Sequence, residues 1–550
     1  MDKATRLLSH IRGREEEVEY PDFETMWQQV ERQLPDPNTR LKTVSARSGR
    51  KWRKYTLLTV AATVLVATPV LASVTNQWDR LLSYRSGLQN ALDQGLGQTI
   101  EKTVTQGNSK LTVNTALIDE NRTVILFTLD TGVGKDKFPG FSKSVLVDAE
   151  GKEHGTVSTI RWDETTQKWN GYFESHWVPQ EMESEVSFRL DDLHLAKQMY
   201  KNIDYSVKTS GDKIHKISVN RDGIQDVKIQ AFDQGDKVMV DMFTSYSAEK
   251  NNNIVSLKIW KGTTPIKEAG TSKLGTPNES GEINAQHYFN KKDLEQDNLR
   301  YTLSYMAEEA RPKLDWSIPL SLNKAKMLSA TVEKQIDTTF EYAGVTTHFD
   351  KMILTPTQIR LQGTEIKTKG YLPFPFQHIA LKVDGIQING SMEYTDRESN
   401  EVTYRFEIPR HFKMKSDAVV SFVGKYEVLL KRDVREPIHM KGISETKKSL
   451  VTKVGGYDVK WTYYKKDGNL YVQSESDDPT FGGVNQTYIK LNGERTSAKP
   501  VSLNFTGDGN NKAVDMYKDY PSDEAEIYIF WYYAEDPQKE VEIELKSASK

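Results

Sequence analysis

The sequence of 550 residues contains no cysteine. This absence excludes disulfide bonds, thiolate zinc sites and a cysteine nucleophile. An exported protein of this size from an animal cell would usually contain disulfides, whereas exported proteins of Gram-positive bacteria often fold without them. We therefore expect a bacterial protein.

An excess of charge of either sign is also lacking. The chain has 74 Lys and Arg against 77 Asp and Glu, which gives a formal net charge of −3. Domains that bind nucleic acid carry a basic excess, so no nucleic-acid partner is expected. At roughly 100 to 200 residues per domain, the length predicts several domains rather than one core.

The familiar patterns of catalytic and metal-binding sites are missing as well. No two of the 10 histidines stand at a metal-ligand spacing. The sequence has no phosphate-binding glycine loop, no nucleophile elbow and no calcium loop. We therefore predict no enzyme, no cofactor and no metal site.

One long uncharged segment interrupts this polar sequence. Residues 56–74 read TLLTVAATVLVATPVLASV, without a charged side chain. About 20 apolar residues are needed to cross the hydrocarbon layer of a membrane. A buried core helix is the alternative, but uncharged runs of this length are rare in soluble domains. The segment predicts a single transmembrane helix.

The charges beside this segment predict its orientation. The basic residues on its N-terminal side, with no acid among them, are Arg40, Lys42, Arg47, Arg50, Lys51, Arg53 and Lys54. Positive flanks remain in the cytoplasm, so residues 1–55 are predicted inside and the bulk of the chain outside the cell membrane. A signal peptide is the alternative, because Val70, Ala72 and Ser73 resemble a cleavage site, but its basic region would be much shorter. We expect an uncleaved anchor with a possible proteolytic site there.

The predicted cytoplasmic region, residues 1–55, combines short amphipathic patterns with a basic linker. In the second pattern the apolar side chains that share one helix face are Phe23, Met26, Trp27, Val30 and Leu34. Helices this short are marginal alone, so this face is predicted to bind a partner. The alternatives are that the two patterns pair as a hairpin or lie on the membrane.

Beyond the membrane segment, a helical pattern over residues 75–97 gives way to alternating strands that repeat. Their anchors, Val104, Val219, Ile336 and Val451, follow one another at intervals of 115, 117 and 115 residues. A turn glycine follows each anchor, at Gly107, Gly223, Gly344 and Gly455. A β-rich repeat of this length has the size of a sandwich domain with its own core.

The predicted fold is therefore mainly β. It consists of four tandem β-sandwich-like extracellular modules after one transmembrane helix and a short helical cytoplasmic region. The predicted modules are residues 98–209, 210–326, 327–442 and 443–550, after the juxtamembrane helix 75–97.

The segment GLGQTIEKTVTQGNSKLTVNTALIDENRTVILFTLD, residues 95–130, resembles the bacterial domain-of-unknown-function family 4179. Similar proteins occur in Gram-positive bacteria, and some are encoded beside extracytoplasmic-function sigma factors and taken to be their membrane-bound anti-sigma factors. The resemblance implies a sigma factor as the cytoplasmic partner. The zinc-binding His-Cys-Cys pattern of the best-known anti-sigma domain is excluded, because the chain has no cysteine.

These observations favour a membrane-anchored regulator, an anti-sigma factor whose extracellular domains sense an envelope signal through an unknown extracellular ligand. The alternative is a structural or adhesive cell-surface protein whose β-modules present a binding face. An envelope enzyme is disfavoured because no cluster of titratable residues is evident.

Overall fold

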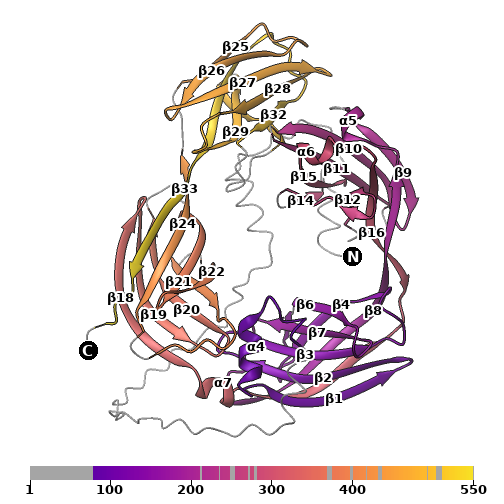
Figure 1. Cartoon of the computed structure of the whole chain (residues 1–550), viewed down its shortest axis with the longest axis vertical. Coiled ribbons are helices and arrows are strands. Elements are labelled where there is room, and N and C mark those ends of the chain that lie inside the picture. Colours follow the sequence, from indigo (N-terminus) through magenta and orange to yellow (C-terminus); the bar gives the residue numbers. More distant parts are fainter. Residues whose placement is uncertain are drawn as a thin grey trace. The chain divides into compact units, whose positions relative to one another are not determined.

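A computed structural model describes most of the predicted extracellular part of the chain (Figure 1). The described residues are 78–155, 157–210, 213–234, 236–247, 254–269, 273–277, 281–367, 375–396, 400–415, 418–431, 436–491, 493–502 and 511–548. Within these ranges, no helix is long and apolar enough to cross a membrane. The predicted transmembrane helix at residues 56–74 and the predicted cytoplasmic region lie outside them.

The described chain is mainly β, as the alternation of the sequence predicts. Its helices are short: α4 (Ser86–Asp93), α5 (Val207–Ser210), α6 (Lys291–Leu294) and α7 (Ala325–Ser329). The helical pattern over residues 75–97 yields α4 in its middle, and Gly95 follows the helix with a φ of 71°. Glycine adopts this left-handed backbone without strain, so the chain can turn there into the first strand.

Two sheets enclose the core of the first lobe. One contains, in spatial order, β1 (Gln98–Gln106), β2 (Ser109–Ile118), β3 (Thr123–Asp130), β7 (Lys168–Ser175) and β6 (Val157–Asp163). The other contains β5 (Glu153–Gly155), β4 (Phe138–Val147), the first half of β8 (Glu183–Ile203) and β17 (Asp315–Asn323).

The second lobe has the same two-layer construction. Its first sheet contains β9 (His215–Arg221), β10 (Ile224–Gln234), β11 (Lys237–Tyr246), β15 (Ile283–Asn290) and β14 (Lys273–Pro277). Its second sheet contains the second half of β8, β16 (Leu299–Ala310), β12 (Ser256–Lys261) and β13 (Thr264–Pro265).

The third lobe is built from one curled sheet. It contains, in spatial order, β18 (Val332–Tyr342), β19 (Val345–Leu354), β20 (Gln358–Lys367), β23 (Glu401–Glu407), β22 (Ile386–Asp396), β21 (Phe376–Val383), β24 (Val420–Lys431) and β33 (Glu524–Glu544). The two ends of the sheet meet where Ile336 forms a bridge with Ser547. Side chains from both ends therefore share one core.

The fourth lobe again packs two layers around a core. One layer contains β26 (Lys448–Val454), β27 (Tyr457–Lys466), β28 (Asn469–Glu475), β32 (Ala513–Tyr517) and β31 (Lys499–Ser502). The other contains β25 (Ile438–Lys441), the first half of β33, β29 (Phe481–Leu491) and β30 (Glu494–Ser497).

The predicted turn glycines form the first hairpin of each lobe. Gly107, Gly223, Gly344 and Gly455 have φ values of 55°, 76°, 80° and 57°. Each follows the first strand of a hairpin, before β2, β10, β19 and β27 respectively. The sequence pattern therefore located the four hairpins correctly, because left-handed turn positions favour glycine.

Long strands join the lobes in pairs (Figure 1). β8 pairs with β17 in the first lobe and with β16 in the second lobe, and β33 pairs with both β24 and β29. The predicted boundary after residue 326 assigns β17 to the second module, whereas Trp316 and Leu320 of β17 lie in the first core. In the sequence, the second lobe is thus inserted before β17, the last strand of the first lobe. The fourth lobe is likewise inserted before the second half of β33, which is the last strand of the third lobe.

The same pairing is visible in the spacing of the anchors. Val104 and Ile336 are 232 residues apart, and so are Val219 and Val451. The larger repeat is therefore a two-lobed unit that occurs twice, once before and once after α7.

Hydrogen bonds from side chains close the open edge of β17. The Gln98 side chain donates to the Ser321 carbonyl at 2.7 Å and accepts from the Asn323 N–H at 2.9 Å. Gln106 makes the same two kinds of bond with the backbone of Asp315, at 2.7 and 3.1 Å. A glutamine amide carries one donor group and one acceptor, so it replaces the missing neighbouring strand.

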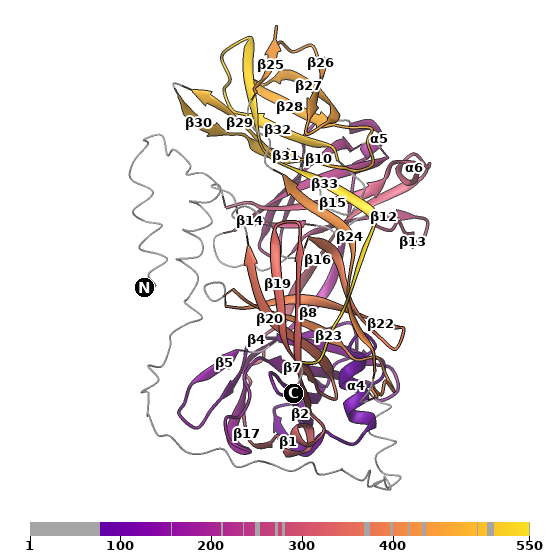
Figure 2. The ribbon, with the colours of Figure 1, turned by 90° about the vertical axis from the view of Figure 1, so that its left-hand side faces the viewer.

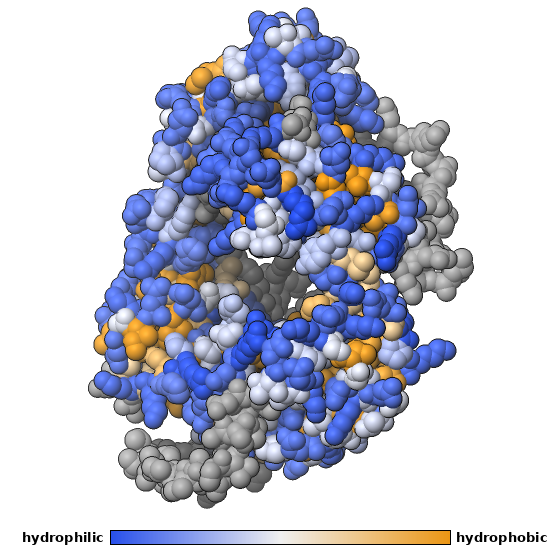
Figure 3. Space-filling model, turned by 45° about the vertical axis from the view of Figure 1, so that its right-hand side comes forward, coloured by the Kyte–Doolittle hydropathy of each residue, from blue (hydrophilic) through white to orange (hydrophobic). Residues whose placement is uncertain are grey.

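The surface of the described chain is polar. Figure 3 shows a mostly hydrophilic face on which hydrophobic side chains form separate patches. A soluble β-domain normally has such a surface, because strands alternate between the core and water.

Candidate functional site at helix α4

The helix α4 lies against the outer face of the first sheet. Leu88 and Ala91 are fully buried, and Leu92 is nearly so. They pack on side chains of the first sheet and of α7, namely Leu117, Val124, Leu126, Tyr172 and Met327. This packing explains the run VILFTL in β3: successive side chains enter the first core and the α4 contact, so both faces of the strand are buried.

The opposite face of α4 meets the third lobe. The Ser86 hydroxyl donates to the Ile408 carbonyl at 2.8 Å. The Asn90 amide donates to the Pro356 carbonyl at 3.0 Å, and its oxygen accepts from the His411 N–H at 3.1 Å. These partners lie between 266 and 322 positions away in the sequence. Connecting segments of the third lobe thus hold a helix that precedes the first lobe (Figure 2).

Gly87 allows this close approach. A Cβ atom at this position would lie 1.8 Å from the carbonyl oxygen of Thr357. No carbon atom can come so near an oxygen without displacing the backbone. Glycine is unfavourable inside a helix by about 1 kcal/mol relative to alanine, so its presence here is explained by the contact.

An arginine lies at the centre of the contact. Arg122 has no exposed surface, and its Nη1 lies 3.0 Å from Glu174 Oε1. Its Nη2 donates to Thr357 Oγ1 at 2.7 Å and lies 3.6 Å from Glu407 Oε2. One guanidinium therefore joins a carboxylate of the first lobe to two side chains of the third.

Arg85, just before α4, joins the same carboxylates. Its Nη1 lies 2.5 Å from Glu174 Oε2, and its Nε lies 3.6 Å from Glu407 Oε1. The contacts of the two arginines with Glu174, in the first lobe, are thus shorter than their contacts with Glu407, in the third lobe. The shorter pairs are expected to persist when the lobes separate, because charge-assisted hydrogen bonds are strongest at short distance.

The charges in this cluster stabilise one another. Burial alone would raise the pKa of Glu174, but Arg85 and Arg122 outweigh it and lower the pKa to about 2. Burial likewise opposes the charge of Arg85, yet Glu174 and Glu407 raise the pKa of Arg85 above its usual value. Glu174 and Arg85 therefore stay ionised at neutral pH.

A second buried set of polar groups adjoins the cluster. Asp119 Oδ2 accepts from Thr355 Oγ1 at 2.9 Å and from Thr357 Oγ1.

Arg410 of the third lobe binds two carboxylates beside α4. Its Nε lies 2.7 Å from Asp93 Oδ2, and its Nη1 lies 3.3 Å from Asp79 Oδ1. The segment that contains α4 is thus fixed at both ends by the third lobe. We use the name α4 clamp for the contacts that α4, Arg85, Asp119 and Arg122 make with Glu174 and with the third lobe.

The carboxylates of the clamp face arginines or hydroxyl donors. Within the described ranges, no three side chains of the metal-ligating types gather at one place.

The residues that the sequence singled out lie elsewhere. The predicted partner-binding residues Phe23, Met26, Trp27, Val30 and Leu34 lie outside the described residues. So do the residues of the possible proteolytic site, Val70, Ala72 and Ser73. Those predictions remain predictions.

Sequence reasoning missed the clamp. Its central residues occupy the turn DENR between the apolar strands β2 and β3, which looks like an ordinary solvated turn. Asp119 and Arg122 are nevertheless 2% and 0% exposed. Only their partners in the third lobe, more than 200 positions away, reveal the role.

Comparisons with known proteins give one family and one distant structure. The crystal structure of the conserved domain protein from Bacillus anthracis aligns at 9% identity and a TM-score of 0.32, over 64% of this chain and 81% of that chain. A TM-score this low defines no shared fold. No curated protein matches the chain significantly.

The family match covers α4 and part of the first lobe. Residues 47–131 match the family described as Domain of unknown function (DUF4179). The matched range contains α4, the strands β1 to β3 and two residues of the turn between β2 and β3, Asp119 and Arg122. It confirms the resemblance of residues 95–130, and the chain thus carries a DUF4179 domain.

Proposed function

We propose that this chain is a membrane-anchored anti-sigma factor in which the extracellular lobes control the juxtamembrane helix. The observation that carries the proposal is the α4 clamp. A helix that comes soon after the predicted membrane segment is held by two lobes whose residues are distant in sequence. Any signal that separates these lobes would therefore alter α4.

The predicted cleavage point lies close to the clamp in the sequence, and this position links the clamp to proteolysis. Trp78, the first described residue, is fully buried beside α4 and lies only six positions after Ala72. A protease needs an extended and accessible segment, so tight docking of Trp78 and α4 protects the neighbouring chain. Release of the clamp exposes it, and cleavage after Ala72 detaches the lobes from the membrane segment.

On the cytoplasmic side, the proposal assigns sigma-factor binding to one helix face. The face carrying Phe23, Trp27 and Val30 would bury itself in a groove of the sigma factor. No metal is needed for this mode of binding.

Two substitutions in the full chain test the two halves of the proposal. Trp27→Glu places a charge on the apolar face and is expected to abolish co-purification of a sigma factor. Gly87→Ala disrupts the clamp and is expected to increase the amount of the fragment cleaved after Ala72, detected by a tag at each end of the chain. Gly134→Ala is the matched control, because a Cβ there meets nothing within 4 Å.

Two results would contradict the proposal. One is the absence of a sigma factor from purified full chain and from a fragment of residues 1–55. The other is full biological function after deletion of residues 1–40, which is the behaviour expected of a structural or adhesive surface protein.

A further inference from the structure

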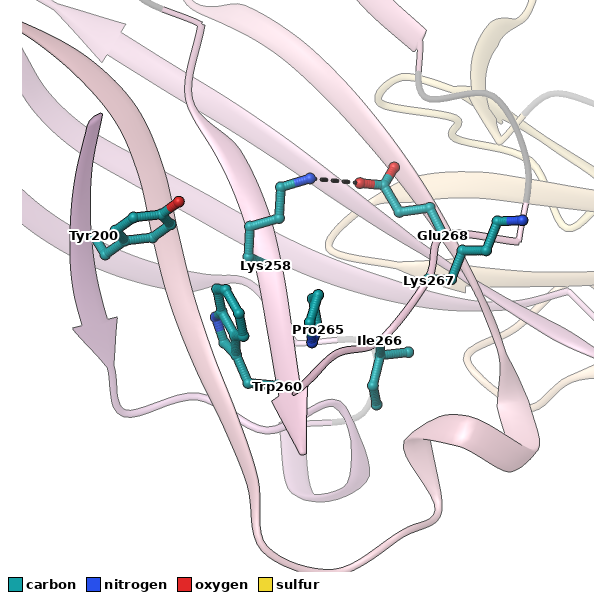
Figure 4. Close-up of a pocket in the computed structure, with 7 residues that line it drawn as sticks. All are labelled: Tyr200, Lys258, Trp260, Pro265, Ile266, Lys267 and Glu268. Atoms are coloured by element: carbon teal, nitrogen blue, oxygen red, sulfur yellow. Dashed lines mark hydrogen bonds and ion pairs between the residues drawn. The ribbon is translucent and has the colours of Figure 1, made fainter. Parts of the chain in front are cut away.

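The second lobe has a groove that the α4 clamp does not use. Its volume is about 490 Å³, and it lies over the outer face of the sheet that contains β8, β16 and β12. The residues that line it are Tyr200, Lys258, Trp260, Pro265, Ile266, Lys267 and Glu268 (Figure 4).

Two aromatic rings form one side of this groove. The ring of Tyr200 meets the ring of Trp260 edge to face, with centroids 6.0 Å apart. Tyr200, near the C-terminal end of β8, is 56% exposed. An aromatic side chain normally buries most of its surface in a sheet, so this exposure leaves a flat apolar surface available to a ligand.

The tryptophan is held in place before any ligand binds. Its Nε1 donates to Thr302 Oγ1 at 2.9 Å, and Thr302 Oγ1 donates in turn to the Lys258 carbonyl at 3.3 Å. The guanidinium of Arg300 lies 5.2 Å from the centroid of the Trp260 ring. A fixed side chain loses little entropy on binding, which favours a recognition role.

The charged residues around the rings are mostly basic. Lys258 lies 3.2 Å from Glu268, and Glu268 lies 3.2 Å from His287 as well. The charge of Glu268 thus offsets that of Lys258, while Lys267 and Arg300 leave the groove positive. The groove is therefore complementary to a ligand with apolar faces and negative groups.

We propose that this groove binds an anionic saccharide chain. A sugar ring has a flat face of C–H groups that can stack on Tyr200 and Trp260, and hydroxyl edges that hydrogen-bond to charged side chains. Lys267 and Arg300 would pair with its carboxylate or phosphate groups. The edge strand beside the groove, β13, has only two residues, and Pro265 has no backbone N–H, so it offers little of the backbone pairing that an extended peptide needs.

The site goes beyond the proposed regulator and does not depend on it. The groove would bind an envelope saccharide whether or not the cytoplasmic region binds a sigma factor. The test is therefore a binding assay without any sigma factor, so that failure of one proposal leaves the other intact.

Calorimetry of the purified full chain in detergent tests the site. A short oligogalacturonate, a saccharide with a carboxylate on each ring, is the probe. Tyr200→Ala is expected to weaken its binding about tenfold, since one aromatic contact is lost. Lys267→Glu should weaken binding by at least a similar factor. Tyr84→Ala is the matched control, because Tyr84 is an aromatic residue that is 88% exposed.

Three outcomes would overturn the proposal. These are no binding of oligogalacturonate at millimolar concentration, equal binding of polyglutamate, which has charge without sugar rings, and equal loss of binding in the Tyr84→Ala control. Because Tyr200 is exposed, its substitution should leave the melting temperature unchanged, so a loss of binding cannot be assigned to unfolding.

Discussion

Arg122 Nη2 lies 2.7 Å from Thr357 Oγ1, although 235 positions separate the two residues in the sequence. Both side chains are fully buried. A buried arginine is stable only when carboxylates and hydrogen-bond acceptors surround it, and here they come from both lobes. The relationship therefore ties the stability of the DUF4179 domain to the third lobe.

Loss of the Arg122 charge is expected to destabilise the clamp strongly. Arg122→Met leaves the buried Asp119 and the partly buried Glu174 and Glu407 with fewer partners, and loss of one partner of a buried ion pair costs roughly 3–5 kcal/mol. The check is native-state hydrogen exchange of the full chain, read at the amides of α4 and β3. Lys135→Met is the control, because the Lys135–Glu164 pair is exposed, and it should leave these amides unchanged. Equal protection in both variants would show that the cluster does not hold α4.

Gly87→Ala is expected to loosen α4 despite the better helix propensity of alanine. Propensity alone predicts a gain of about 1 kcal/mol, whereas the clash with the Thr357 carbonyl predicts a net loss. The measurement is the rate of limited proteolysis near Trp78 in the full chain. Gly134→Ala, in open space, should leave the rate unchanged. Slower proteolysis of Gly87→Ala would contradict the docked helix.

The fourth lobe is expected to lose stability as the pH rises above about 4. Burial raises the pKa of Asp515 to about 6 from an ordinary 3.8, although Thr487 donates to it through its N–H and hydroxyl. The folded lobe therefore favours the protonated acid. The free energy of unfolding of the lobe should fall by about 3 kcal/mol as the pH rises from 3.8 to about 6, and it should stay constant at higher pH.

Asp515→Asn should remove this pH dependence, because asparagine is neutral and still accepts a hydrogen bond. The measurement is hydrogen exchange at β32 between pH 4 and 8. Asp478 is the comparison: its hydrogen bonds with Thr480 lower its pKa, so its contribution has the opposite sign and is present above its ordinary pKa. An unchanged profile for Asp515→Asn would rule out Asp515 as the cause.

The edge of β17 is expected to open when its glutamine partners are replaced. Gln98→Leu and Gln106→Leu together leave the N–H groups of Asn323 and Asp315 without their acceptors, at a cost of about 0.5–1.5 kcal/mol each. The two amides should then exchange faster, and the chain should self-associate more readily through the exposed edge. Thr103→Val, also in β1, is the control. It removes only the exposed hydrogen bond between the hydroxyls of Thr103 and Thr112, so it should change neither amide exchange nor self-association.

Local features of the sequence predicted the strands well. Alternation around Val104 and its three counterparts, followed by a glycine, identified four hairpins whose glycines all have positive φ. Such features depend on a few neighbouring residues, so they are readable without the fold. The pairing of lobes was not readable, because β8 and β33 look like ordinary strands until their distant partners are known.

The sequence by itself determined the β-rich character of the chain, the repeat and its hairpins, since alternation and turn residues act locally. Only the tertiary structure decided that β17 completes the first core and that Gly87 and Arg122 face the third lobe. Those contacts join residues more than a hundred positions apart. They depend on how whole lobes pack, and no local pattern encodes which distant surface will meet a charged turn.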